Sequence, residues 1–294
     1  MKFHLSLLLP LACAIVYVVG ALTVKRAAAS GVGVWRTSFL SNWAIALLFI
    51  PVWFWQGGRV RPLIDYWQPA AAAFLFFLGQ AFTFKALSRG DVSVTTPVMG
   101  TKVILVALFS SLLKVGQVPL QWWLGALLST TAIALLHRGE GTVRRNVGPT
   151  VALAFCSATA FSLGDVLLQK WLPLWGAGNF FPPMFVLVAV FSCGFIPFFT
   201  APLTALTWPA GRWVGAAAVL MAVNNAGIVL AIGIVGSATA VNIVYSLRGL
   251  FSVLLIWSIG HWFASTEQHH SPAVLRSRLV GAGLMVGAVM LVLI

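Results

Sequence analysis

Two stretches of this chain decide its fold, because each places one positive charge inside a long apolar run. Residues 90–113 read GDVSVTTPVMGTKVILVALFSSLL, and residues 236–259 read GSATAVNIVYSLRGLFSVLLIWSI. Lys102 and Arg248 stand at matching positions in the two stretches, 146 residues apart. A lysine or arginine at the centre of a spanning helix costs about 2.5–3.5 kcal/mol on translocon scales. Two such charges at matching positions indicate a function.

The composition predicts an all-α integral membrane protein that crosses the lipid bilayer many times. Of 294 residues, 60% are hydrophobic and only 8% are charged, whereas soluble domains carry about 25% charged residues. A spanning helix needs about 20 mostly apolar residues. The apolar runs predict ten transmembrane helices over 5–24, 34–55, 68–87, 92–114, 119–137, 148–170, 182–201, 213–234, 238–263 and 275–294.

The net charge of +13 does not indicate a nucleic-acid partner. Only 5 acidic residues offset 18 lysines and arginines, and these are scattered over short loops and helix ends instead of forming one basic face. We therefore expect no nucleic acid. At the N-terminus, Lys25–Arg26 follow the first apolar run where a signal peptide would have small residues, so this run predicts a retained helix.

The two halves of the chain resemble each other. LACAIVYVVGALTVKR (11–26) aligns with FCSATAFSLGDVLLQK (155–170), and the two charged stretches follow in the same order. The pattern predicts a duplication, with one five-helix repeat over 1–140 and a second over 147–294. Because five is odd, the second repeat must enter the membrane in the opposite sense. Inverted repeats of this kind occur in secondary transporters, which bind substrate near the midplane where the repeats meet.

With these features the chain resembles the ten-helix, EamA-type members of the drug/metabolite transporter superfamily. The resemblance rests on the repeat and on two stretches, ALSRGDVSVTTPV from Ala86 and GQVPLQWWLGALL from Gly116. It implies a basket of helices around a central cavity. Members usually have a glutamate where Gln117 stands, so the chain departs from the pattern there, and Glu267 is a candidate equivalent acid in the second half.

Lys102 and Arg248 are the first candidates for substrate binding. Each lies about ten residues into its helix, near mid-membrane at about 1.5 Å rise per residue, which is too deep to reach an interface. Two cations facing one cavity favour a carboxylate or phosphate group, which Arg248 would hold bidentately and Lys102 as a point charge. The alternative is that each cation pairs with a buried acid or caps a broken helix.

Asp165 is the only acid well inside a predicted helix, so it cannot neutralise both cations. A carboxylate at such a depth can bind and release a proton, which makes Asp165 a candidate for coupling transport to a proton. The other interpretation is a structural ion pair with Lys170 or Arg248. In this superfamily, exporters of drug cations have an acid in their first helix, and none stands there in this chain, which disfavours a cationic substrate.

Several uncharged polar and aromatic residues are further candidates to line a substrate site. Asn242 and Tyr245 stand six and three residues before Arg248, on roughly the same side of the helix. Trp35 and Arg36 begin the second predicted helix and face either the cavity or the interface. The other candidates within apolar runs are Tyr17, Gln80, Asn224 and Asn225. Hydrogen bonding between helices is the commoner role of such residues.

We expect no cofactor, no metal and no enzymatic activity. His261, His269 and His270 lack the i, i+4 spacing of a helical zinc site and have no cysteine nearby. The chain also has too few acids to build the active site of a membrane enzyme acting on lipids, which is a less favoured alternative. A scaffold or receptor subunit, a third class, would have no need of charges at mid-membrane.

The leading hypothesis is a secondary transporter that moves a small polar metabolite with an anionic group, such as an amino acid or another organic acid, by alternating access. A coupling proton or a counter-substrate would be its second partner. The alternative within this class is a broad-specificity drug/metabolite exporter, which would tolerate Lys102→Ala. We expect a monomer or homodimer in the inner membrane of a bacterium. Charge counting favours termini that face outward, whereas the resemblance implies cytoplasmic termini.

Overall fold

The computed structural model describes residues 5–55, 58–89, 92–136, 147–259 and 272–294, and within these ranges the chain is helical without any strand. Nine segments there are long and apolar enough to span a membrane, and Leu120–Leu136 is a shorter apolar helix. The predicted all-α membrane fold is thus confirmed. The helices are α2 (Leu8–Ala29), α3 (Val34–Trp55), α4 (Trp67–Arg89), α5 (Val92–Gly100), α6 (Lys102–Leu112), α7 (Leu120–Leu136), α8 (Val147–Trp175), α9 (Ala177–Ser192), α10 (Trp208–Val235), α11 (Ala238–Tyr245), α12 (Arg248–Ile259) and α13 (Pro272–Leu293), with short 3₁₀ turns η1 (Leu63–Tyr66), η2 (Cys193–Phe198) and η3 (Leu203–Ala205).

Two of the predicted helices end later than their apolar runs suggested. α2 continues through Lys25 and Arg26, and Arg26 places its guanidinium over the Trp213 ring at 5.8 Å from the centroid. α8 continues to Trp175. After each helix a glycine takes a left-handed conformation, Gly31 with φ 80° and Gly176 with φ 74°. Glycine adopts this conformation without steric cost, so these glycines, more than the end of hydrophobicity, limit the helices.

The fourth and ninth predicted helices are each interrupted immediately before their central cation. α6 starts at Lys102 and α12 starts at Arg248. At both breaks a hydroxyl donates to the carbonyl three residues earlier: Thr101 Oγ1 to Val98 O at 2.7 Å, and Ser246 Oγ to Ile243 O at 2.6 Å. Such bonds compete with the regular helical ladder. Pro97 lies inside α5 and not at the break.

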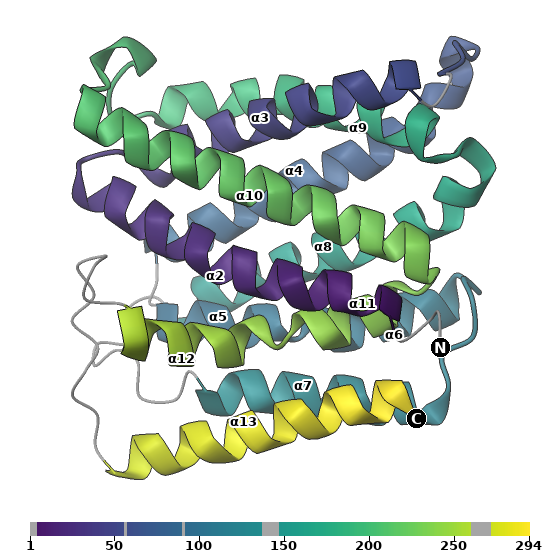
Figure 1. The fold of residues 1–294 in the computed structure, drawn as a ribbon, viewed down its shortest axis with the longest axis vertical. Coiled ribbons are helices and arrows are strands. Elements are labelled where there is room, and N and C mark those ends of the chain that lie inside the picture. Colours follow the sequence, from purple (N-terminus) through teal and green to yellow (C-terminus); the bar gives the residue numbers. More distant parts are fainter. Residues whose placement is uncertain (1–4, 56–57, 90–91, 137–146, 260–271) are drawn as a thin grey trace.

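The helices pair reciprocally between the first and second halves of the chain. α2 packs on α10 while α4 packs on α8, and α3 packs on α9 while α7 packs on α13. Figure 1 shows α7 and α13 side by side at one end of the molecule, and the two chain termini on the same side of it. This pairing is the arrangement expected for two related halves. The inverted repeats over 1–140 and 147–294 themselves stay a prediction.

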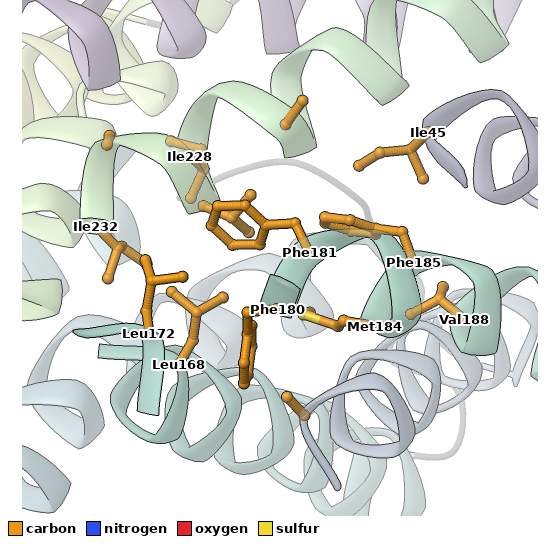
Figure 2. Packing of buried hydrophobic residues seen from close by; sticks show 14 of the residues in the cluster. Ile45, Leu168, Leu172, Phe180, Phe181, Met184, Phe185, Val188, Ile228 and Ile232 are labelled. Carbon is orange, nitrogen blue, oxygen red and sulfur yellow. The ribbon is translucent and has the colours of Figure 1, made fainter. Parts of the chain in front are cut away.

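The largest hydrophobic cluster lies among α3, α8, α9 and α10. Its centre is a group of phenylalanines on α9, with Phe49 of α3 stacked on Phe185 at 4.8 Å between ring centroids. Figure 2 shows Phe181 between Ile228 of α10 and Phe185, with Leu168 and Leu172 of α8 below. This packing fixes the ends of α8 and α10 that lie on the side of the chain termini.

Candidate functional site

A cavity of about 330 Å³ lies at the centre of the helices, beside both helix breaks. It is lined by the second half of α2, the first half of α3 and the second half of α4, together with residues of α5, α6, α8, α10, α11 and α12. Because α2 and α4 end where α3 begins, the cavity extends from mid-membrane toward the side opposite the chain termini. Its volume falls in the range of about 300–1,000 Å³ found for small-molecule sites.

Arg248 lines this cavity between two tyrosine rings. Its guanidinium carbon lies 4.7 Å from the Tyr17 centroid and 4.6 Å from the Tyr245 centroid. The two rings meet edge to face at 6.1 Å. Among the described residues no carboxylate pairs with Arg248, since Asp165 is bonded to Lys102 and Asp65 lies in η1. The ring faces stabilise the charge through cation–π attraction, and the Tyr245 hydroxyl also interacts with the guanidinium.

Lys102 also lines the cavity, but it has an anionic partner. Its Nζ lies 2.9 Å from Asp165 Oδ2, with both side chains largely buried, and 5.6 Å from the centroid of Phe161. Asn242 Nδ2 donates to the same carboxylate oxygen at 2.8 Å. Asp165 of α8 thus joins the start of α6 to α11 across the two halves. The ion pairs considered from the sequence, with Lys170 or Arg248, are not the one that forms.

The other polar candidates form two hydrogen-bonded groups at the cavity. Tyr245 Oη donates to Asn224 Oδ1 at 3.2 Å, and Asn224 Nδ2 donates to Asn225 Oδ1 at 3.3 Å. Gln80 forms a reciprocal amide pair with Asn42 of α3, at 2.8 and 2.9 Å. Gln80, Asn224 and Asn225 line the cavity, so each stands both in an internal bond and beside the space for a ligand.

Trp35 and Arg36 lie outside the set of residues that line the cavity. Trp35 stacks on Phe198 at 5.0 Å and touches Phe84 and Phe195, which places it in an aromatic cluster against η2. Arg36 is buried, and its Nη1 donates to Ala201 O at 3.0 Å. In this structure Arg36 therefore holds the connection after α9. Lys25 and Arg26, near the end of α2, do not line it either.

Sequence reasoning missed the hydroxyls and the apolar surface of the cavity. Thr37, Ser38 and Ser41 of α3 line one wall, and Thr83 of α4 bonds Ser157 of α8 at 2.7 Å. Small hydroxyl residues are common packing residues of membrane helices, so only their spacing along one face of α3 could have marked them. The remaining lining residues include Phe76, Phe84, Met99, Phe161 and Met221.

The arrangement combines one uncompensated cation, one ion pair and a ring of amides and hydroxyls in a largely apolar cavity. Such a site can bind a small molecule with one anionic group, because Arg248 supplies the charge and donors while the aromatic and methionine side chains cover an apolar body. No group of three or more histidine, cysteine or acidic residues that could hold a metal occurs among the described residues. His261, His269, His270 and Glu267 lie outside those residues.

Comparisons with known proteins agree with the fold and the membrane class. Residues 4–138 match the EamA-like transporter family. A solved structure, described only as the crystal structure of a protein, superposes with a TM-score of 0.77 at 17% identity and covers 98% of each chain. At this identity the match shows the fold alone. The curated proteins contain no significant match to this sequence.

Proposed function

We propose that this chain, whose residues 4–138 match the EamA-like transporter family, is a secondary carrier for a small metabolite with one anionic group. A membrane transporter of the drug/metabolite type is supported by the family match and by the helical, membrane-spanning fold. The substrate class rests on one observation. Arg248 lines the central cavity against the Tyr17 and Tyr245 rings and has no carboxylate partner among the described residues.

The pairing of Lys102 changes its role in this proposal. With Asp165 at 2.9 Å, Lys102 adds no net charge to the cavity, so the cavity carries about one positive charge, that of Arg248. This favours a monocarboxylate or a zwitterion such as an amino acid over a doubly charged anion. Asp165 is the group whose protonation would release Lys102 and Asn242 together, which makes it the candidate for proton coupling.

Alternating access is part of the proposal because a cavity on one side of the membrane must open to the other for transport. The two helix breaks at the central cations are suited to this, since broken helices at mid-membrane form binding sites in secondary transporters. A broad-specificity exporter remains the second candidate. It is supported by the many phenylalanine and methionine side chains in the cavity wall.

A thermal-shift screen of the purified protein against carboxylates, zwitterions and organic cations tests the substrate class. We expect compounds with one carboxylate to raise the melting temperature, since a ligand at about 100 times its Kd stabilises the folded state by about 2.7 kcal/mol. Arg248→Ala should weaken this binding roughly 10- to 100-fold, the effect of losing charge-assisted hydrogen bonds. Arg212→Ala, at an exposed position on α10 away from the cavity, is the matched control.

Two outcomes would overturn the proposal. One is an Arg248→Ala protein that binds the carboxylate as well as the parent does. The other is stabilisation by organic cations alone, which would favour the exporter of drugs. A transport assay separates the two candidates. If the protein is a carrier for anionic metabolites, Lys102→Ala and Arg248→Ala should each abolish uptake into proteoliposomes. A broad-specificity exporter would tolerate Lys102→Ala.

A further inference from the structure

A second cavity of about 670 Å³ lies on the side of the chain termini. The last turns of α8 and α10, the first turns of α9 and the residues that follow α6 line it. It shares no lining residue with the central cavity. Lys114 and Lys170 are its charged lining residues, and no acid lines it. An anion is therefore favoured in both cavities, although they open toward opposite sides.

A thin hydrophobic wall separates the two cavities. Ile228 lines the central cavity, whereas Phe181, Leu172 and Ile232 line the second one. All four belong to one buried cluster, and Figure 2 shows Phe181 directly beside Ile228. α8 and α10 come close here, because a Cβ added at Gly233 would lie 2.6 Å from Leu172 Cδ2. The wall is thus formed where the ends of α8 and α10 meet.

Gln169 holds this meeting of helices together with its amide group. Its Nε2 donates to Gly236 O at 2.8 Å and to Val115 O at 3.4 Å, and its Oε1 accepts from the Ala238 N–H at 2.8 Å. Gly236 ends α10 in a left-handed conformation, and Ala238 begins α11. One side chain of α8 therefore fixes the connection that leads into the broken helix carrying Arg248.

We propose that Gln169 is the gate residue that keeps the second cavity separate from the substrate site. When its bonds to Gly236 and Ala238 break, the ends of α8 and α10 can part, and the central cavity joins the second one. Lys114 and Lys170 then attract the anion at the mouth on the side of the termini. This inference rests on the proposed carrier function and adds the residue that controls one of its two openings.

Sided labelling of a single cysteine tests the gate. In a background of Cys13→Ala, Cys156→Ser and Cys193→Ser, Ala21→Cys places a thiol in the central cavity. A membrane-impermeant anionic methanethiosulfonate is added from either side, using intact cells and inverted vesicles. We expect labelling mainly from the side opposite the termini. Gln169→Ala should raise labelling from the side of the termini roughly 30-fold, as expected for the loss of about two ordinary hydrogen bonds.

Two further variants make the result specific. Gln169→Glu keeps an acceptor for the Ala238 N–H but loses the donor to Gly236 O. Labelling from the side of the termini should therefore increase less than in Gln169→Ala. This variant keeps the test valid if the alanine variant misfolds. Gln68→Ala is the matched control, because Gln68 also bonds the end of α8, accepting from Trp175 Nε1 at 2.6 Å, away from the wall. It should label like the parent.

Unchanged sidedness in both Gln169 variants would overturn the gate, and so would an equal increase in Gln68→Ala. The assay needs no substrate, so it separates this inference from the proposed function. If Arg248 does not bind an anion, the thermal-shift screen fails while the labelling pattern still reports on Gln169.

Discussion

At the scale of single residues, the proposed substrate class depends on the environment of Arg248. A cation at mid-membrane usually needs an anion or water, and here two tyrosine faces stand in for part of that stabilisation. Tyr245 is itself buried and fixed by Asn224. The guanidinium is thereby held in one orientation before a ligand arrives, which lowers the entropic cost of binding.

Two substitutions separate the contributions of the Tyr245 ring and the Tyr245 hydroxyl to anion binding. Tyr245→Phe keeps the ring over Arg248 and loses the hydroxyl that interacts with Asn224 and Arg248, so we expect anion affinity to fall about fivefold, or about 1 kcal/mol. Tyr245→Leu removes the ring and should cost about 2 kcal/mol, or roughly 30-fold in affinity. Titration calorimetry with a carboxylate found in the screen measures both. Equal losses in the two variants would show that the ring contributes nothing, and Tyr66→Phe in η1 serves as the control.

The Lys102–Asp165 pair gives a second prediction, on stability. Removing one partner of a buried pair leaves an uncompensated charge and costs about 3–5 kcal/mol. Lys102→Met and Asp165→Leu should therefore each lower the melting temperature, while the double variant should recover much of the loss. Thermal unfolding in detergent followed by tryptophan fluorescence measures this. Additive losses in the double variant would mean that the two side chains do not interact.

The ion-pair partner of Asp165 could not be predicted from the sequence. The two intramembrane cations and an acid at a similar depth were readable from residue type and depth. Which cation meets the acid depends on how α8 packs against α6, and no local pattern encodes that distance. The sequence neighbour Lys170 is five residues away on α8, whereas the actual partner is 63 residues away in the chain.

At the scale of helices, hydrophobicity predicted the elements and their order but not their interruptions. All ten apolar runs correspond to helices of the described chain, counting α5–α6 and α11–α12 as one run each. No proline or glycine lies between Tyr245 and Arg248, so the sequence contains no strong helix-breaking residue that would predict the break at Ser246. Its cause is a serine that bonds backward to Ile243 O and across to Ser129 of α7.

The contact between α4 and α8 can be tested at one glycine. A Cβ at Gly79 would lie 2.8 Å from three carbons of the Phe161 ring, so Gly79→Ala must displace the ring that lies below Lys102. We expect a loss of about 1–3 kcal/mol in unfolding free energy, typical of overpacking. Gly215→Ala on α10 has open space and should be neutral or stabilising by up to about 1 kcal/mol. Chemical denaturation compares them, and equal effects would argue against the tight contact.

At the scale of the whole molecule, the parity of membrane crossings decides which side each cavity faces. With 17 residues, α7 is shorter than each of the nine spanning segments of the described chain, and it measures about 26 Å at 1.5 Å per residue. The hydrocarbon core is about 30 Å thick, so α7 is close to the lower limit. It packs along α13, which is long enough to span. A spanning α7 gives ten crossings and both termini on one side, as Figure 1 shows.

Reporter fusions test whether the number of membrane crossings is even, and they determine the orientation of the protein in the membrane. Reporters at the N-terminus and after Ile294 should lie in the same compartment, and a tag inserted at Gly31, between α2 and α3, should lie in the other. The resemblance to EamA-type carriers predicts the cytoplasm for both termini. Termini in different compartments would mean that one of the ten helices, α7 first of all, does not cross. Because the central cavity extends toward the α2–α3 connection, cytoplasmic termini would make this structure open to the outside, with Gln169 closing the path to the cytoplasm.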